Sequence, residues 1–301
     1  MTKARHGIYA AAISPFRSDT RLDVTGLADY CRYLLGEGGC DGVAPLGTTG
    51  ESNSIALEDR IAVPAALAQA GIASDRVIIG TGAPAVHDAI QVTKSAIAAG
   101  YPNVLVLPPF YYKNVSDDGL FEFYATLIDA IDDPQLRIYL YHFPQMSATP
   151  ITPDLAIRLR TAHGPIIAGL KDSSGDFEQS RAFVAATGGV EAGFDIYPSS
   201  ESLLFEGLAA GCAGIISGST NVTANHVQDA QKLDGAARTA AYDKIKAARD
   251  AIAQFPMVAA MKQAQTWRSG DERWLQTAPP LRPLTAEQAE RLRSDLDRIL
   301  G

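Results

Sequence analysis

Cysteine and long apolar runs are scarce in this sequence, and each shortage excludes a class of protein. The three cysteines among 301 residues, Cys31, Cys40 and Cys212, show neither paired nor metal-type spacing. This is typical of buried thiols in a reducing compartment rather than of a disulfide framework. No apolar run approaches the ~20 residues that a transmembrane helix needs. We therefore expect a cytoplasmic protein that does not span a membrane.

Positive charge is also in deficit. The 26 basic and 34 acidic residues give a net charge of −8, and the basic residues form no block, so nucleic acid and anionic membranes are not expected partners. Any anionic ligand must then be bound by a few local groups. The apolar stretch at residues 7–13 ends at Ser14-Pro15 without an evident processing site. We expect it to form a first strand rather than a signal peptide.

The motifs of several common active sites are missing as well. His, Cys and Asp residues nowhere cluster with the spacing of metal ligands. The sequence contains no G-x-S-x-G turn for a nucleophilic serine and no G-x-x-x-x-G-K-S/T loop for a nucleotide phosphate. It therefore favours a chemistry that needs neither a metal ion nor a bound cofactor.

Eight short apolar runs recur along the first 220 residues. They are continuous rather than alternating in polarity, which is typical of strands buried on both faces of a parallel sheet. In chain order the runs cover residues 8–16, 42–47, 76–82, 103–110, 137–144, 165–172, 194–200 and 213–220. The segments between them have the pattern of helices, and one of these, 152–164, carries Thr152 at its N-cap and Pro153 at its first position.

Eight alternating strand–helix units predict a closed (β/α)8 TIM barrel over residues 1–222. An open doubly wound sheet is the alternative, because periodicity cannot show closure. Beyond residue 222 the strand pattern stops, and segments 236–255 and 285–300 have the pattern of helices. We expect residues 223–301 to form a C-terminal helical subdomain.

Barrel enzymes carry their active sites at the C-terminal ends of the strands, so the residues that follow each run are the candidates. The run at 165–172 contains Lys171 near its end. A partly desolvated amine is more readily neutral, and a neutral amine attacks a ketone to form a Schiff base. The iminium group withdraws electrons, so an adjacent carbon–carbon bond can break without a metal. The alternative is a lysine that only reaches solvent where the strand emerges.

Groups at other strand ends fit the same chemistry. The hydroxyls of Tyr141 and Tyr112 could relay protons. The loop that begins at Gly47, with the sequence GTTGE, could offer backbone N–H groups and hydroxyls to a carboxylate. Each feature taken alone also has a structural explanation, as a half-buried strand tyrosine or an ordinary tight turn.

Five motifs in this order resemble the landmarks of the dihydrodipicolinate synthase / N-acetylneuraminate lyase family of Schiff-base aldolases. They are GTTGES (47–52), PPFYY (108–112), YHFP (141–144), GLKDSSGD (169–176) and GIISGSTNV (214–222). The resemblance covers essentially the whole chain, including the helical tail. It implies a metal-independent class I lyase that acts on a small 2-keto acid such as pyruvate.

The resemblance also implies roles for individual residues. Lys171 would be the Schiff-base lysine, Tyr141 the proton-transferring tyrosine, and Thr48 would link Tyr141 by hydrogen bonds to Tyr112. In the family that last tyrosine is usually inserted from a neighbouring subunit. This implies an oligomer, and we expect a homotetramer built as a dimer of dimers.

Other positions would contact the substrate by the same resemblance. Thr49, with the backbone of the loop that begins at Gly47, would hold the carboxylate of the 2-keto acid. Tyr111 and Ser217 would lie at the rim of the pocket.

Two departures from the family pattern bear on the substrate. Members that make dihydrodipicolinate carry an arginine for the carboxylate of the aldehyde where this chain has Met146, and a thioether cannot replace a bidentate cation. Sialic acid lyases carry an acidic segment after the seventh strand, of which this chain keeps one acid, Glu201. We therefore count Met146 and Glu201 among the substrate-binding positions.

These observations favour a 2-keto-3-deoxy sugar acid, cleaved to pyruvate and an aldehyde, as the substrate. Four alternatives stay open. They are a dehydration or hydratase–aldolase reaction through the same enamine, 4-hydroxy-tetrahydrodipicolinate synthase activity, a non-catalytic barrel that binds a keto acid, and a phosphate-binding barrel that uses residues 217–221.

Overall fold

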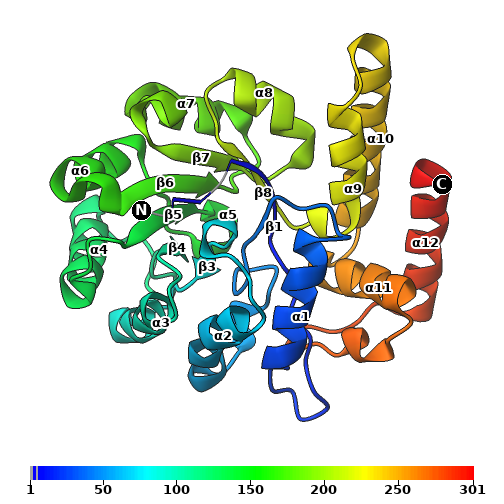
Figure 1. Ribbon diagram of the computed structural model, residues 1–301, viewed down its shortest axis with the longest axis horizontal. Coiled ribbons are helices and arrows are strands. Elements are labelled where there is room, and N and C mark those ends of the chain that lie inside the picture. The colour runs from blue at the N-terminus through cyan, green and yellow to red at the C-terminus, as the bar shows by residue number, and fades with distance from the viewer. Residues whose placement is uncertain (1–2, 5) are drawn as a thin grey trace.

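The computed structural model describes residues 3–4 and 6–301 and contains the eight predicted strands (Figure 1). They are β1 (Gly7–Ala10), β2 (Gly42–Val43), β3 (Ile79–Gly80), β4 (Asn103–Val106), β5 (Arg137–His142), β6 (Ile167–Asp172), β7 (Asp195–Pro198) and β8 (Gly214–Ser217). Most are shorter than the apolar runs that predicted them, because the runs continue into the loops at the C-terminal ends of the strands.

Hydrogen bonds close the sheet into a barrel. All strand pairs are parallel, in the orders β2-β1-β8 and β3-β4-β5-β6-β7. The two groups join where Ile78 N–H donates to the carbonyl of Val43 at 3.0 Å, and where Ala213 N–H donates to the carbonyl of Ile196 at 2.8 Å. The predicted (β/α)8 barrel is therefore confirmed, and the open sheet is wrong.

Helices cover the outside of the barrel. In chain order they are α1 (Val24–Leu35), α2 (Leu57–Gln69), α3 (Val86–Ala98), α4 (Asp117–Ile131), α6 (Pro153–His163), α7 (Phe177–Thr187), α8 (Leu204–Ala209) and α9 (Thr220–Gln231). The short helix α5 (Pro144–Ser147) lies instead at the C-terminal end of β5. The predicted start of α6 is confirmed, since the Thr152 hydroxyl accepts from Leu155 N–H and Pro153 is the first helical residue. No helix among residues 3–4 and 6–301 is both long and apolar enough to cross a membrane.

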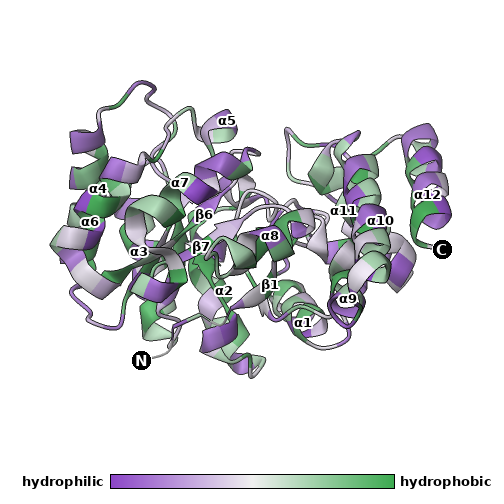
Figure 2. Ribbon diagram, turned by 90° about the horizontal axis from the view of Figure 1, so that it is seen from above, coloured by the Kyte–Doolittle hydropathy of each residue, from purple (hydrophilic) through white to green (hydrophobic). Residues whose placement is uncertain are grey.

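Three further helices form the C-terminal part, namely α10 (Gly235–Ala253), α11 (Met257–Ser269) and α12 (Ala286–Leu300). They stand together at one side of the molecule, beside α9 (Figure 2). The boundary that the sequence suggested after residue 222 lies inside α9, the helix that directly follows β8.

Bulky aromatic residues fill the interior of the barrel. Tyr9, Tyr139 and Tyr197 are fully buried there, and the rings of Tyr9 and Tyr139 both contact that of Tyr197. Below them, the carboxylate of Asp195 is buried and pairs with Lys3. Among the described residues, this packing fills the barrel toward its N-terminal end and leaves the C-terminal end as the place for a ligand.

A buried ion pair ties the C-terminal helices to the barrel. Lys262 of α11 pairs with Glu51, which belongs to the GTTGES loop, and the two side chains are almost wholly inaccessible to solvent. The Lys262 ammonium also donates to the carbonyl of Gln276 at 2.7 Å, and Glu51 accepts from Ala278 N–H at 3.1 Å. Burial raises the pKa of Glu51 against the opposing effect of Lys262.

Replacing Lys262 by methionine is expected to lower the free energy of unfolding by about 3–5 kcal/mol, because Glu51 would stay buried without a counter-charge. Urea unfolding followed by circular dichroism measures this loss. A double variant, Glu51→Gln with Lys262→Met, serves as the control and should recover much of the stability. Equal stability of the wild type and the single variant would contradict the role given to this pair.

Candidate active site

Lys171 and Tyr141 lie side by side at the C-terminal end of the barrel. They are directly paired residues of the neighbouring strands β6 and β5. The Lys171 ammonium nitrogen lies 3.3 Å from the Tyr141 hydroxyl and 4.5 Å from the centre of its ring. Only 3% of Lys171 is exposed. The lysine therefore does not project into bulk solvent, which was the alternative explanation for a lysine at the end of this strand.

Thr48 extends this pair into a chain of three polar side chains. The Tyr141 hydroxyl donates to Thr48 Oγ1 at 3.4 Å. The residues come from strands β5 and β6 and from the loop after β2, far apart in sequence. The structure therefore brings together three of the four predicted catalytic residues within one chain.

The loop that carries Thr48 is held in a fixed conformation. Leu46 and Glu51 have φ values of 59° and 57°, a region in which residues other than glycine are uncommon. A side chain at Gly50 would meet the carbonyl oxygen of Ala12 at 2.9 Å, so this position requires glycine. The Ser14 hydroxyl donates to the Gly50 carbonyl at 2.7 Å. The conformation presents Thr48 and Thr49 to the barrel mouth.

A cavity of about 820 Å³ opens above these residues. This volume is within the range of small-molecule sites. Lys171, Tyr141, Thr48, Thr49 and Met146 are among its lining residues, as the sequence predicted. Gly47, at the start of the same loop, lines a much smaller adjoining hollow with Thr48 and Tyr141.

The C-terminal helices supply much of the cavity wall. Residues 256–259 at the start of α11 and 280–283 before α12 line it. Most of these residues are apolar, and Phe143 and Ile216 add to the apolar part of the wall. The C-terminal extension therefore contributes directly to the binding site.

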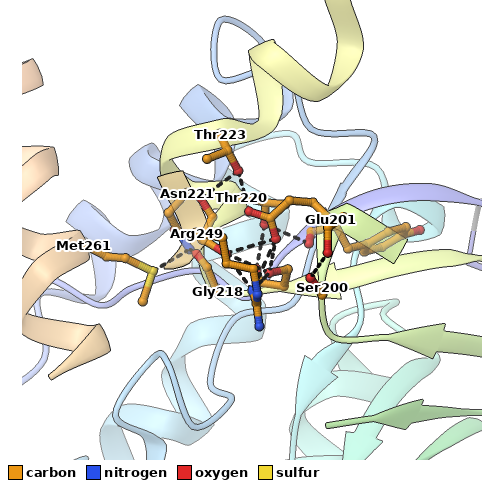
Figure 3. Close-up of polar contacts among 12 residues, drawn as sticks. Ser200, Glu201, Gly218, Thr220, Asn221, Thr223, Arg249 and Met261 are labelled. Atoms are coloured by element: carbon orange, nitrogen blue, oxygen red, sulfur yellow. Dashed lines mark hydrogen bonds and ion pairs between the residues drawn. The ribbon is translucent and has the colours of Figure 1, made fainter. Parts of the chain in front are cut away.

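Arg249 of α10 also lines the cavity, and the sequence gave no indication of this. Its guanidinium donates to the hydroxyls of Ser217 at 2.9 Å and Ser219 at 2.7 Å, and lies 3.3 Å from Glu201 Oε2 (Figure 3). Three basic residues lie close together on this helix, and only the packing of α10 against α9 and the 3-10 helix Glu201–Leu203 shows which one reaches the barrel.

Glu201 and Ser217, which the sequence placed at the substrate, are found beneath Arg249 instead. Glu201 is fully buried and accepts hydrogen bonds from Ser217, Ser219 and Thr223 at 2.7–2.9 Å. Ser217 is 1% exposed. Neither residue is among the described ones that line the cavity. Both contact the guanidinium of Arg249, so their role is to hold Arg249 in position.

Tyr111 and Tyr112 lie apart from Lys171. They follow β4, are each 74% exposed, and contact each other edge to face with ring centres 5.3 Å apart. Within the described part of this chain, neither lines the cavity. A second subunit would have to receive Tyr112 for it to reach an active site.

His142 and Asp172 are the last residues of β5 and β6. Neither is among the described residues that line the cavity, but both support the site. The His142 Nδ1 atom accepts from Ile151 N–H at 3.0 Å, and burial lowers the pKa of this histidine. Asp172 accepts from the Ser180 hydroxyl at 2.6 Å. These bonds anchor the strand ends beside Tyr141 and Lys171.

A (β/α)8 barrel with a buried lysine and a tyrosine at the floor of such a cavity fits the class of pyruvate-type aldolases and lyases. Comparison with known proteins gives the family. The family model of the Dihydrodipicolinate synthetase family matches residues 4–299, and this chain belongs to that family. It is accordingly an enzyme of the aldolase and lyase type.

Individual relatives agree with this assignment. An uncharacterized DapA-like lyase from Chloroflexus aurantiacus is 36% identical over 300 residues, covering 98% of this chain and 97% of the relative. The crystal structure of dihydrodipicolinate synthase from Agrobacterium tumefaciens is 29% identical, with a TM-score of 0.87 over 99% of this chain and 100% of the other. That of YagE from Escherichia coli, in complex with pyruvate, is 25% identical, with a TM-score of 0.86 over 98% of each chain.

Proposed function

We propose that this enzyme forms a Schiff base between Lys171 and a 2-keto acid, and cleaves a 2-keto-3-deoxy sugar acid to pyruvate and an aldehyde. The observation that carries the proposal is the contact between the buried Lys171 amine and the Tyr141 hydroxyl on the cavity floor. The pyruvate complex of YagE supports pyruvate as the keto acid.

The proposed reaction follows from this contact. The neutral amine attacks C2 of the keto acid, and loss of water gives the iminium. A base then removes the proton of the C4 hydroxyl, the C4 oxygen forms the aldehyde carbonyl, and the electrons of the C3–C4 bond pass into the iminium as an enamine. Protonation at C3 and hydrolysis release pyruvate and the free amine. The Tyr141 hydroxyl lies within reach of the nitrogen and can carry these protons.

The loop residues Thr48 and Thr49 would orient the substrate. Thr48 holds the Tyr141 hydroxyl, and Thr49 lines the cavity beside it. Hydroxyl and backbone N–H groups of such a loop can bind the C1 carboxylate of the keto acid. The iminium group is the electron sink of the reaction, so we propose that no metal ion or other cofactor is needed. We also propose that the enzyme is a homotetramer, as the family resemblance implies.

The direct test is a screen of 2-keto-3-deoxy sugar acids for pyruvate release, measured with a coupled lactate dehydrogenase assay in the presence of a strong chelator. We expect release from at least one member of the set, unaffected by the chelator. Loss of all activity on chelation would contradict a metal-independent reaction.

Aspartate semialdehyde is expected to be a poor partner for pyruvate. Met146 stands where family members that make dihydrodipicolinate carry an arginine, and no carboxylate among the described lining residues can pair with the ammonium group of this aldehyde. A missing charge-assisted contact of this kind costs roughly 30-fold or more in kcat/KM. Condensation is measured against the best aldehyde found in the screen. Comparable rates for the two aldehydes would favour 4-hydroxy-tetrahydrodipicolinate synthase activity instead.

A further inference from the structure

Residues 276–283 run from the short 3-10 helix Glu272–Leu275 toward α12, and 280–283 of them line the cavity. We call this segment the strap. Most of its residues are exposed, and of its eight members only Ala278 is buried. A segment with so little burial gains little stability from packing, so its hydrogen bonds decide where it lies.

Hydrogen bonds join the strap to the body of the protein at one place. The carbonyl of Gln276 accepts from the Lys262 ammonium at 2.7 Å, and Ala278 N–H donates to Glu51 Oε2 at 3.1 Å. Within the described part of the chain, the remaining hydrogen bonds of the strap are internal or lead back to the preceding 3-10 helix. Both external bonds therefore end on the two members of the buried Lys262–Glu51 pair.

The strap itself is stiff. Three of residues 279–283 are prolines, whose rings fix φ. The Thr277 hydroxyl donates to the Leu281 carbonyl at 2.9 Å, and Leu281 N–H donates to the Ala278 carbonyl at 3.1 Å, which closes a turn. Because a stiff segment moves as a unit with its anchor, the buried pair determines where residues 280–283 stand in the cavity.

The other side of the anchor belongs to the loop that carries Thr48. Glu51 N–H donates to the Thr48 carbonyl at 3.0 Å, and Thr48 holds the Tyr141 hydroxyl. The Lys262 ammonium is also held 4.4 Å from the centre of the buried ring of Phe16. One buried side chain, that of Glu51, therefore joins the loop at the proposed reaction centre to the strap that forms the outer wall.

We propose that Glu51 and Lys262 are positioning residues that set where the outer wall stands relative to the Lys171–Tyr141 floor, and thereby the fit of the aldehyde-derived part of the substrate. The inference rests on the proposed function and adds two determinants of specificity that do not touch the substrate, since neither is among the described residues that line the cavity. Pyruvate needs only the floor and the loop, and the backbone hydrogen bonds of the loop do not involve the strap. Loss of the anchor should therefore weaken binding of a full-length substrate and spare the capture of pyruvate.

Two double variants separate the anchor from the stability of the fold. Glu51→Gln with Lys262→Met keeps an oxygen for Ala278 N–H and loses the bond to Gln276, whereas Glu51→Leu with Lys262→Met loses both bonds. Each removes the two buried charges together and keeps a similar volume, a change that generally costs little stability. The best sugar acid from the screen serves to measure kcat and KM, and borohydride trapping on Lys171 measures the capture of pyruvate.

We expect KM for the sugar acid to rise about 10-fold in the first double variant and about 100-fold in the second, with a much smaller change in kcat. The pyruvate concentration that half-saturates trapping should stay close to that of the wild type. Hydrogen–deuterium exchange gives a readout without turnover, since the amides of residues 276–285 should exchange faster in the second variant. Arg273→Ala removes an exposed side chain that pairs with Asp271 just before the strap, and as the matched control it should behave like the wild type.

Several outcomes would overturn the inference. They are an unchanged KM in both double variants, a loss confined to kcat, unchanged exchange of residues 276–285, and equal weakening of pyruvate capture and sugar acid binding. If the wild type traps no keto acid on Lys171, the proposed function itself fails, whereas normal trapping with an unchanged KM refutes only the positioning role. If pyruvate is trapped and no sugar acid is cleaved, the proposed substrate is wrong, and the exchange measurement alone decides whether the pair anchors the strap.

Discussion

Replacing Lys171 by alanine is expected to abolish the covalent capture of pyruvate and to lower kcat/KM by about 10⁴-fold or more, because no other described residue on the cavity floor carries an amine. Wild-type protein treated with pyruvate and borohydride should gain the mass of a reduced pyruvate adduct, and peptide mapping should place it on Lys171. The variant should show no such gain.

A matched control separates loss of the amine from loss of the fold. Lys246→Ala removes an exposed lysine of α10 and should be trapped like the wild type. Thermal unfolding of both variants, followed by circular dichroism, should stay close to that of the wild type. Labelling of the Lys171→Ala protein to the same extent as the wild type would refute the Schiff-base mechanism.

Replacing Tyr112 by phenylalanine is expected to slow turnover by about 10²- to 10⁴-fold, the scale of a lost proton-transfer group. Tyr112 is 74% exposed and absent from the cavity of its own chain, so an effect of this size requires that it acts in a neighbouring subunit. Trapping of pyruvate should remain possible, because the Lys171–Tyr141 contact does not involve Tyr112.

Subunit exchange distinguishes action across an interface from a local effect. Mixing Tyr112→Phe and Lys171→Ala proteins under exchanging conditions should restore activity, because hybrids combine an intact Tyr112 from one chain with an intact Lys171 from the other. Tyr111→Phe is the matched control, since it changes the ring partner of Tyr112 and should retain far more activity. If hybrids form by native mass spectrometry and activity does not return, Tyr112 does not complete the site of another subunit.

The barrel and the centre of the site could be predicted because both depend on local sequence. Continuous apolar runs predicted each strand, and in a parallel barrel the C-terminal ends of all strands meet at one rim. Lys171 and Tyr141 lie near the ends of such runs, so the correct fold was enough to predict that they lie close together. The same argument extends to Thr48, which follows β2.

The outer part of the cavity could not be predicted in this way. Arg249 lies on an amphipathic helix with Lys244 and Lys246 nearby, and nothing in that local pattern singles it out. Its partner Glu201 is 48 residues away in sequence. The family resemblance placed Glu201 at the substrate, whereas the packing of α10 against the 3-10 helix Glu201–Leu203 buries this acid beneath Arg249. Such contacts depend on how the C-terminal helices pack against the barrel, and the hydrophobic periodicity of the sequence does not indicate this packing.

The docking of α10 and α11 beside the barrel mouth also bears on how this enzyme could change in evolution. The amine and its tyrosine are carried by β5 and β6, whereas Arg249, residues 256–259 and residues 280–283 contribute a separate wall. Heritable variation in that wall can alter which aldehyde is accepted while the bond-breaking groups stay constant. A library of variants confined to these positions would therefore yield enzymes that differ in substrate preference and retain Lys171 and Tyr141.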